Sequence, residues 1–330
     1  MRAINHIMDF APNPNESRDS ILSRIHSEEL TMRSLSLLLW VAITLVGCGR
    51  SPRETRAPMP GPTPTPNTNG IQYHGGRVLT SPTGPNLYYI WYGNWSGNTG
   101  PAILTDLANN IGGSAYFNII TSYYGSSNVT VTNAVNFIGS TNDAYSQGTA
   151  PSVAQIRMIV SSAIAGGLAK DTNGVYMVLT SEDVAPSSFC KGLCGGWSHF
   201  SMDGSDIKYA WVGNPARCPT RCAPAQPTTG PNGNLGVDAM AATLVHEFIN
   251  SVTDSDGDGW YDSSGKAPAS ICGTPQLAFP NAYVTSHGAL ATVRLGPRDY
   301  FLTSNWVNAN GGYCALRYPR TTTLNRNRHR

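Results

Sequence analysis

The stretch AMAATLVHEFINSVTDSDGDGWYDSSG, residues 239–265, joins an apolar segment to a loop that is rich in carboxylates. The apolar segment, with His246 and Glu247 inside it, predicts a helix. The loop that follows carries four acidic residues: Asp254, Asp256, Asp258 and Asp262. Carboxylates this close together repel one another unless water, a basic partner or a bound cation relieves the repulsion. Because the rest of the chain has few charges to offer, we expect a cation here.

Charged residues make up 13% of the chain, about half of the roughly 25% that is usual for a soluble domain. With 40% apolar residues, the composition is typical of a globular extracytoplasmic protein and not of a disordered one. Residues 70–316 carry 10 Lys and Arg against 14 Asp and Glu. They offer no basic patch, so we expect no nucleic-acid partner. The Arg-rich end, residues 319–330, is interpreted as a solvated basic tail.

Residues 32–48 have the features of an export signal. Arg33 precedes an apolar run, residues 35–46, which is shorter than the about 20 residues of a membrane-spanning helix. The run ends at Leu-Val-Gly-Cys, residues 45–48, which resembles a bacterial lipobox. This resemblance implies that Cys48 carries a lipid and anchors the protein to a membrane, and Gly49 after it favours the outer membrane or cell surface. An ordinary signal peptide with an incidental cysteine is the alternative.

The neighbouring segments are interpreted from their composition. Residues 1–31 precede a complete signal, and we interpret them as an upstream extension from a wrongly chosen start codon. Residues 49–69 are rich in Pro and Thr without apolar periodicity, so we expect a stiff linker. Residues 70–318 then form one globular domain.

The globular part alternates strand and helix patterns. We expect strands at residues 86–95, 128–138, 175–180 and 207–213. We expect helices that begin near Gly100 and Ser152, and a third around His246. This order predicts an α/β (α+β) fold in which helices pack on a mixed sheet. After Asp262 the pattern fades into an irregular part with short strand-like pieces at residues 289–295 and 300–302.

Six cysteines follow Cys48: Cys190, Cys194, Cys218, Cys222, Cys272 and Cys314. An even number in an exported chain indicates three disulfides, with fifteen conceivable pairings. We expect a bridge between Cys272 and Cys314. For the other four we expect either a bridge within the first C-x3-C pair or a local cross-link between the two pairs. Export disfavours a zinc cluster of these cysteines.

The expected helix carries the pattern H-E-x-x-N. His246 and Asn250 share a helix face, and in H-E-x-x-H proteases the two histidines bind zinc while the glutamate acts as general base. Asn250 is a poorer zinc ligand than imidazole or carboxylate, and Asp254 lies two turns along nearly the same face as an anionic candidate. Glu247 is the candidate catalytic base. The alternative for His246 and Glu247 is a polar pair on the surface of an amphipathic helix.

The carboxylate loop supports a second interpretation. Asp254, Asp256 and Asp258 follow the D-x-D-x-D-G spacing of a calcium loop, and Asp262 stands at its ninth position. The twelfth position is Gly265 instead of Glu, so the match is imperfect. Zinc and calcium compete for Asp254, and a solvated polar turn without an ion is the third alternative.

Two further histidines, His199 and His287, are candidate outer ligands or transition-state donors, although a lone histidine is more often a hydrogen-bonded surface residue. The sequence contains no G-x-S-x-G turn, no G-x-G-x-x-G and no phosphate-binding loop. These absences argue against serine hydrolases of the nucleophile-elbow type and against nucleotide-binding enzymes.

Several ordered segments resemble the Exordium / phosphate-induced protein family: YYIWYGNW, FCKGLCGGWSHF, YAWVGNPARCPTRCA and PNGNLGVDAMAATLVHE. The resemblance runs from about Ile71 to Tyr318 and includes both C-x3-C pairs. It implies a secreted protein like the plant members, which are associated with the cell wall and have no established enzyme activity. Bacterial members carry H-E-x-x-E-x-x-T-D, which resembles a zincin helix, and this chain has Asn250 where they have the second glutamate.

Two functions follow from the sequence. One is a surface-anchored, zincin-like domain that binds a divalent metal such as Zn and has hydrolase activity. Its candidate metal ligands are His246, Asn250, Asp254 and His199. The other is a non-catalytic module of the cell surface or cell wall, in which the loop binds Ca. Its candidate contacts to a glycan or peptide partner are Trp91, Trp95 and Trp197.

Overall fold

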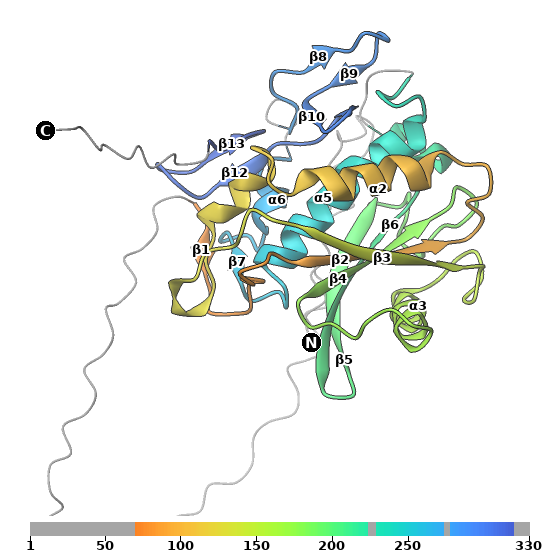
Figure 1. Ribbon diagram of the computed structural model, residues 1–330, viewed down its shortest axis with the longest axis horizontal. Helices are drawn as coiled ribbons and strands as arrows, with labels where there is room; N and C mark the ends of the chain where they lie inside the picture. Colours follow the sequence, from red (N-terminus) through yellow and green to blue (C-terminus); the bar gives the residue numbers. More distant parts are fainter. Residues whose placement is uncertain (1–69, 224–228, 274–277, 320–330) are drawn as a thin grey trace, which may run out of the picture. The chain divides into compact units, whose positions relative to one another are not determined.

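A five-stranded mixed sheet lies at the centre of the computed structural model, which describes residues 70–223, 229–273 and 278–319 (Figure 1). The strand order is β3-β2-β4-β6-β5. The strands span Asn86–Tyr92 (β2), Asn136–Asp143 (β3), Gly174–Thr180 (β4), Gly195–Met202 (β5) and Ser205–Val212 (β6). β2, β3, β4 and β6 run parallel, and β5 lies antiparallel to β6. The mixed sheet expected from the sequence is confirmed.

The interior strands β2 and β4 explain why the sheet has a layer of packed side chains on each face. β4 is a continuous apolar run that is buried along its whole length, as a strand covered on both faces must be. Successive side chains of a strand point to opposite faces. Accordingly, β2 sends Tyr89 and Trp91 into one core and Tyr88 and Ile90 into the other.

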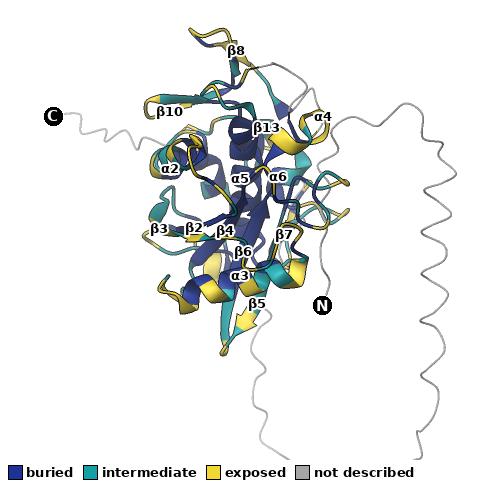
Figure 2. Ribbon diagram, turned by 90° about the vertical axis from the view of Figure 1, so that its right-hand side faces the viewer, coloured by how far each residue is buried: buried dark blue, intermediate teal, exposed yellow. Residues whose placement is uncertain are grey.

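Helices cover both faces of the sheet, as Figures 1 and 2 show. α2 (Gly100–Ile111) and α5 (Leu235–Thr253) pack into one core, and α3 (Val153–Ala165) packs into the other. The expected helices are confirmed. α5 is buried from Gly236 to Thr253. It is therefore a core helix, and the alternative of a surface pair at His246 and Glu247 is wrong.

The C-terminal part consists of short antiparallel pairs, so its expected irregular character is confirmed. The pairs are β8 (Tyr283–Val284) with β9 (Leu290–Ala291), β10 (Val293–Leu295) with β11 (Arg298–Tyr300), and β12 (Asn305–Val307) with β13 (Tyr313–Ala315). β1 (Gln72–Tyr73) pairs with β7 (Trp260–Tyr261). The remaining described helices are α4 (Pro219–Cys222), α6 (Pro268–Ile271), η1 (Phe117–Ser122), η2 (Ser126–Asn128) and η3 (Pro215–Arg217).

Three disulfides join the chain: Cys190–Cys218, Cys194–Cys222 and Cys272–Cys314. The first two connect the two C-x3-C pairs in parallel, which confirms the local cross-link and excludes the bridge within the first pair. The third fastens the residue after α6 to β13, as expected.

Two edge strands differ from the sequence prediction. The strand expected at residues 128–138 begins only at Asn136. Val131 before it is buried in a loop, where its N–H donates to Tyr123 O at 2.9 Å. β5 was not predicted at all. Both β3 and β5 are sheet edges with mostly part-buried or exposed residues, so they lack the continuous apolar run that identifies an interior strand.

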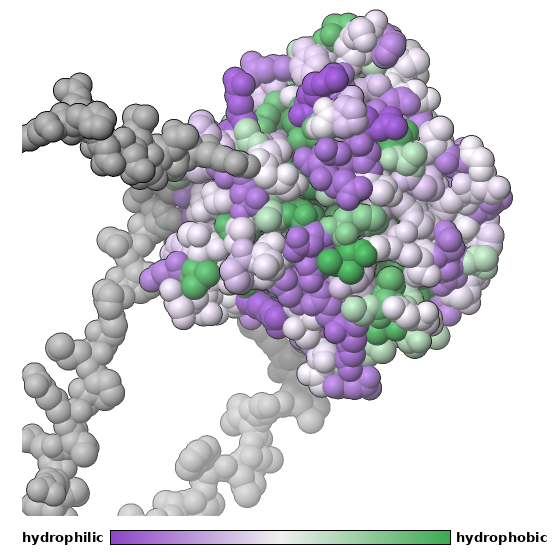
Figure 3. All heavy atoms as spheres, viewed as in Figure 1, coloured by the Kyte–Doolittle hydropathy of each residue, from purple (hydrophilic) through white to green (hydrophobic). Residues whose placement is uncertain are grey.

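The helices within the described ranges include none that is long and apolar enough to cross a membrane. The face shown in Figure 3 is mostly polar, with apolar residues in small separate groups. The export signal, Cys48 and the linker fall in residues 1–69, which lie outside the described residues, as do residues 320–330 of the expected tail.

Candidate functional site

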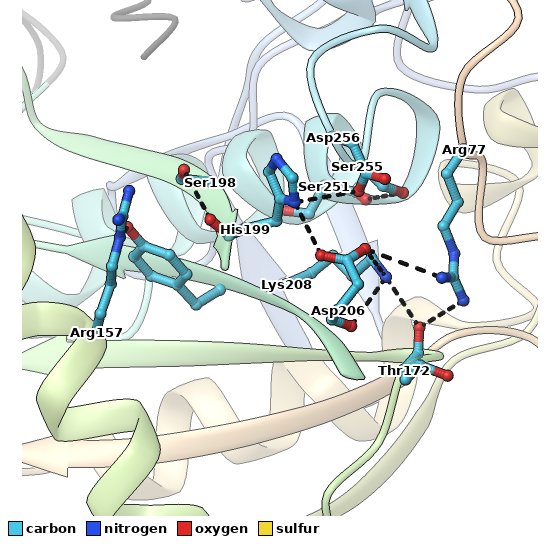
Figure 4. A network of polar contacts seen from close by, with 11 residues as sticks. Arg77, Arg157, Thr172, Ser198, His199, Asp206, Lys208, Ser251, Ser255 and Asp256 are labelled. Carbon is cyan, nitrogen blue, oxygen red and sulfur yellow. Dashed lines mark hydrogen bonds and ion pairs between the residues drawn. The ribbon is translucent and has the colours of Figure 1, made fainter. Parts of the chain in front are cut away.

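The β5–β6 hairpin and the loop after α5 bring together four ionisable side chains: His199, Asp206, Lys208 and Asp256 (Figure 4). The hairpin register places His199 opposite Lys208, and Ser201 opposite Asp206. Paired residues, and residues two positions apart, share one face of a sheet. The loop that follows α5 lies over this face and adds Asp256.

The loop is held in place by its first residues. Ser255 Oγ donates to Ser251 O at 2.9 Å, which prolongs the contacts of α5 beyond its last turn. The N–H of Ser255 donates to Arg77 O at 3.3 Å. Arg77 in turn donates from its guanidinium to Thr172 O at 3.0 Å. Asp256 is thus positioned by contacts to segments that lie far apart in the sequence.

His199 lies between the two carboxylates. Its Nδ1 is 2.8 Å from Asp206 Oδ1 and 3.8 Å from Asp256 Oδ1. On the other side of Asp206, Lys208 Nζ lies 2.6 Å from Oδ2 and donates to Thr172 O at 3.2 Å. The Lys208 side chain is fully buried, whereas the side chains of His199, Asp206 and Asp256 are 41%, 29% and 24% exposed. Solvent therefore reaches part of the side chains of His199, Asp206 and Asp256 but not that of the lysine.

The pKa values of the two carboxyl groups are shifted in opposite directions. Burial alone would raise the pKa of Asp206, but hydrogen bonds from Lys208 and His199 outweigh it and lower that pKa. Burial, together with the charge of Asp206, raises the pKa of Asp256. Asp256 Oδ1 is buried and accepts no hydrogen bond within the described part of the chain. A positive ion beside it would relieve both the burial cost and the repulsion.

The ligand atoms of His199, Asp206 and Asp256 all lie within 4.8 Å of one another. Within residues 70–223, 229–273 and 278–319, no other group of three or more His, Cys, Asp or Glu residues meets this condition. One imidazole nitrogen and two carboxylates suit a divalent cation such as zinc or manganese. The same groups can also exchange a proton with a bound molecule.

The H-E-x-x-N segment lies elsewhere on α5 and makes different contacts. His246 Nε2 is 3.2 Å from Ser270 Oγ, and Asn250 Nδ2 donates to the same oxygen at 3.2 Å. Asn250 Oδ1 accepts from Ala269 N at 3.0 Å. These side chains fasten α5 to α6 and are not gathered with His199. Their role as metal ligands stays a prediction.

Glu247 faces the start of β5, where a Cβ added to Gly195 would lie 3.1 Å from its Oε1. Only 5% of the residue is exposed, and this burial raises the pKa of Glu247 to about 8. At neutral pH the carboxyl group therefore holds its proton. Its predicted role as a catalytic base stays a prediction.

The carboxylates of the calcium-loop pattern make separate contacts and do not converge on one point. Asp254 is fully buried, and its Oδ1 accepts from Gly259 N at 2.7 Å. Burial, with smaller contributions from Asp258 and Asp256, raises the pKa of Asp254 to about 7. Asp262 Oδ1 accepts from the N–H groups of Ser264 and Lys266 at 2.8 and 2.9 Å, within its own turn. Only Asp256 of these four belongs to the group that includes His199.

The tryptophans expected to contact a glycan are mostly inside the protein. Trp91 and Trp95 are 5% and 8% exposed and pack edge to face at 5.3 Å. Trp95 Nε1 donates to Leu179 O at 3.2 Å. Trp197 is half-buried. The role expected of Trp91 and Trp95 is therefore corrected, because they are core residues of the sheet and present no open ring face.

Sequence reasoning found His199 and Asp256 but missed Asp206 and Lys208. The available signal was Asp203-Gly204, a dipeptide typical of tight hairpins, between residues of strand-like composition. A hairpin assigned on that signal pairs His199 with Lys208 and brings Asp206 to the same face.

Comparison with known proteins places this chain in a family. The model of the family described as phosphate-induced protein 1 conserved region matches residues 71–294. The protein EXORDIUM-like 5 of Arabidopsis thaliana is 32% identical over 218 residues, which are 58% of this chain and 59% of the relative. The protein PHOSPHATE-INDUCED 1 of Nicotiana tabacum is 28% identical over 251 residues, 66% of this chain and 76% of the relative.

The chain spans about three fifths of the length of EXORDIUM-like 5 and of EXORDIUM-like 3 from Arabidopsis thaliana. No solved structure matches it, so the expected likeness to zincins is not confirmed. The family match covers most of the described residues, including the β5–β6 hairpin and α5. The chain therefore belongs to the phosphate-induced protein 1, or Exordium, family.

Proposed function

We propose that this protein is an exported binding protein whose function depends on a divalent cation held by His199, Asp206 and Asp256. The observation that carries the proposal is the convergence of their three ligand atoms within 4.8 Å. The buried Asp256 Oδ1, which accepts no hydrogen bond within the described residues, gives independent support. A buried carboxylate oxygen without a hydrogen-bond partner is stabilised by a cation beside it.

The chemistry of the three groups favours zinc or manganese over calcium, because calcium takes an all-oxygen set of ligands. Lys208 occupies Asp206 Oδ2, which leaves Oδ1 for the ion. His199 would exchange the proton that it shares with Asp206 Oδ1 for the metal. Affinity for the ion is therefore expected to fall as the pH falls, because protons compete with the cation for the ligand atoms.

A cation in this place would join the loop after α5 to the β5–β6 hairpin. The partial exposure of the ligands leaves room for a group from solvent or from a partner molecule. A hydrolase also needs a base beside the ion, and the candidate Glu247 is almost fully buried. A cation-dependent binding role is thus better supported than zinc-dependent hydrolysis. His246 and Asp254 would hold the zinc ion in the hydrolase alternative.

Export is supported by the three disulfides, which persist in oxidising compartments. Anchoring through a lipid on Cys48, at the outer membrane or the cell surface, is the part of the proposal that rests on the sequence alone. Labelling with a palmitate analogue in cells tests it. Loss of the label in Cys48→Ser supports anchoring, and a label that survives the change excludes it.

The cation is tested by calorimetric titration of chelator-treated, full-length protein with zinc, manganese or calcium chloride. We expect one ion per chain, with zinc or manganese bound more tightly than calcium. His199→Ala and Asp256→Asn should each weaken binding by at least about 10-fold. His287→Ala, which removes an exposed histidine elsewhere, is the matched control.

Three results would contradict the proposed site. The first is the absence of stoichiometric binding of any of the three ions. The second is binding that survives both His199→Ala and Asp256→Asn. The third is loss of binding on His246→Ala with full binding in His199→Ala, which would assign the ion to the H-E-x-x-N helix instead.

A further inference from the structure

Two cavities in the C-terminal part of the protein share a lining residue on β10. The first has a volume of about 620 Å³ and lies between residues 114–116, β10 and β13. The second has a volume of about 640 Å³ and lies between residues 229–233 and residues 286–299. Arg294 lines both. Each cavity has the size of a small-molecule site, and together they suit an elongated ligand.

The charge of the first cavity differs from that of the domain around it. Its charged lining residues are Arg294 and Arg317, and no Asp or Glu lines it. The surrounding residues 70–316 have more acidic than basic residues. The second cavity adds Arg298 and His287, with Asp299 as its single acidic lining residue. Arg294 forms an ion pair with Asp299, and Arg298 forms one with Asp106, whereas no described residue pairs with Arg317. An arginine whose charge is not balanced, in an otherwise acidic domain, favours an anionic ligand.

Asp299, which lines only the second cavity, contacts two lining residues of the first. Arg294 NH1 donates to both of its carboxylate oxygens at 3.3 Å, and Tyr283 OH donates to its Oδ1 at 2.9 Å. These contacts fix the guanidinium and the phenol through their polar ends, so the ring of Tyr283 stays exposed. Arg317 makes no hydrogen bond or ion pair from its side chain with the described part of the chain, and it is exposed.

The first cavity is also lined by exposed aromatic rings. Tyr283 and Tyr313 both line it, and both are among the exposed large apolar residues. An exposed tyrosine offers a flat apolar face with a polar rim. Such a ring suits the apolar face of a sugar, while an arginine beside it binds a carboxylate with two parallel hydrogen bonds.

We propose that the two cavities form one binding site for a segment of an acidic polysaccharide, in which arginines bind sugar carboxylates and the tyrosines pack on sugar rings. The site shares no residue with His199, Asp206 and Asp256, so it goes beyond the proposed cation site and can exist without it. A nucleic acid fits less well, because a phosphate on every residue would meet the acidic remainder of the domain.

The test is calorimetric titration of the full-length, chelator-treated protein with three probes of similar length: a galacturonic acid hexamer, a glucose hexamer and a single-stranded oligonucleotide. We expect binding of the galacturonic acid hexamer that weakens with added salt. The neutral hexamer should bind at least about 10-fold more weakly, because the contacts to charged groups are lost.

Variants assign the binding to this site. Arg317→Gln and Tyr313→Ala should each weaken binding of the acidic hexamer by about 3–10-fold. Arg221→Gln removes an exposed arginine that lines neither cavity and should bind like the unchanged protein. Arg317 and Tyr313 make no side-chain hydrogen bond with the described residues, so the folded state should persist, which a thermal unfolding curve verifies.

The proposal fails if the acidic hexamer does not bind, if the neutral hexamer or the oligonucleotide binds as tightly, or if Arg221→Gln loses as much affinity as Arg317→Gln. Cation binding by the same preparation is measured separately. A protein that binds zinc but no acidic hexamer refutes this site alone, and the converse result refutes the cation site alone.

Discussion

The ammonium group of Lys208, which has no exposed side-chain surface, lies 2.6 Å from Asp206 Oδ2. A buried charge that loses its partner keeps the cost of leaving water without the compensating attraction. We therefore expect Asp206→Asn to lower the free energy of unfolding of the metal-free protein by about 3 kcal/mol. Denaturation by urea in the presence of a chelator measures this loss.

Two controls accompany this measurement: an exposed ion pair and a double variant. Lys170 Nζ and Asp203 Oδ2 lie 3.1 Å apart, but the Asp203 side chain is 79% exposed, so Asp203→Asn should cost less than about 1 kcal/mol. Replacing Lys208 by Met together with Asp206→Asn should recover most of the stability, since no buried charge remains. Equal losses in Asp206→Asn and Asp203→Asn would contradict the prediction.

The sequence predicted the interior of the fold better than its edges. β4 and α2 are buried in the way that their apolar patterns predict, because the pattern reflects the core that they face. β3 and β5 stand at the two edges of the sheet, and partly solvated strands carry little of that pattern. Val131 shows the opposite case, because this buried loop residue suggested that the strand begins before Asn136.

The sequence singled out two residues of the candidate site but not their arrangement. His199 and Asp256 were chosen for different ions, and only the pairing of β5 with β6 and the path of the chain after α5 bring them together. Asn250 was chosen for its place on the helix face. Its partners on α6 are tertiary contacts, which helix periodicity cannot indicate.

Burial of Glu247 makes stability depend on pH. Its pKa is about 8 in the folded protein, against 4.5 as the ordinary value. Between these values the folded state holds a proton that the unfolded state has lost, so the free energy of unfolding falls as the pH rises through this window. Glu247→Gln should remove the contribution of Glu247 to this dependence and stabilise the protein at pH 8.5 by a few kcal/mol, on the order of 1.4 per unit of pKa shift. The raised pKa values of Asp254 and Asp256 add a dependence of the same sign, which both proteins share.

Urea denaturation of both proteins at pH 5 and pH 8.5 checks the Glu247 prediction. The two proteins should have similar free energies of unfolding at the lower pH, where the carboxyl group is neutral in the folded state. At the higher pH their free energies of unfolding should differ. A difference that is equal at both pH values would show that the carboxyl group ionises without cost in the folded protein.

Gly195 sets the distance between β5 and α5. A Cβ at this position would lie 2.6 Å from Thr243 Cγ2 and 2.9 Å from Trp211 O. We expect Gly195→Ala to lower the free energy of unfolding by about 1–3 kcal/mol through overpacking. Gly139→Ala is the matched control, because a Cβ on this strand residue meets nothing within 4 Å, and its effect should stay within about 1 kcal/mol. Equal effects of the two changes in urea denaturation would contradict this account of Gly195.

The three disulfides should differ in their contribution to stability although their loops are of similar length. Cys190–Cys218 and Cys194–Cys222 each span 28 residues and tie the same two segments together. If Cys190 and Cys218 are replaced by Ala, the second bridge still closes nearly the same loop. The unfolded chain then gains little freedom, and the loss should be about 1 kcal/mol.

The Cys272–Cys314 bridge spans 42 residues and is the only disulfide of the described chain that crosses the C-terminal part. Its replacement by two alanines releases the whole loop in the unfolded state, so we expect a loss of about 2–4 kcal/mol. Thermal unfolding of both double variants measures the difference, and limited proteolysis locates it, with the first cuts expected between residues 278 and 314. Similar melting temperatures for the two variants would show that native-state packing, and not loop closure, determines what these bridges contribute.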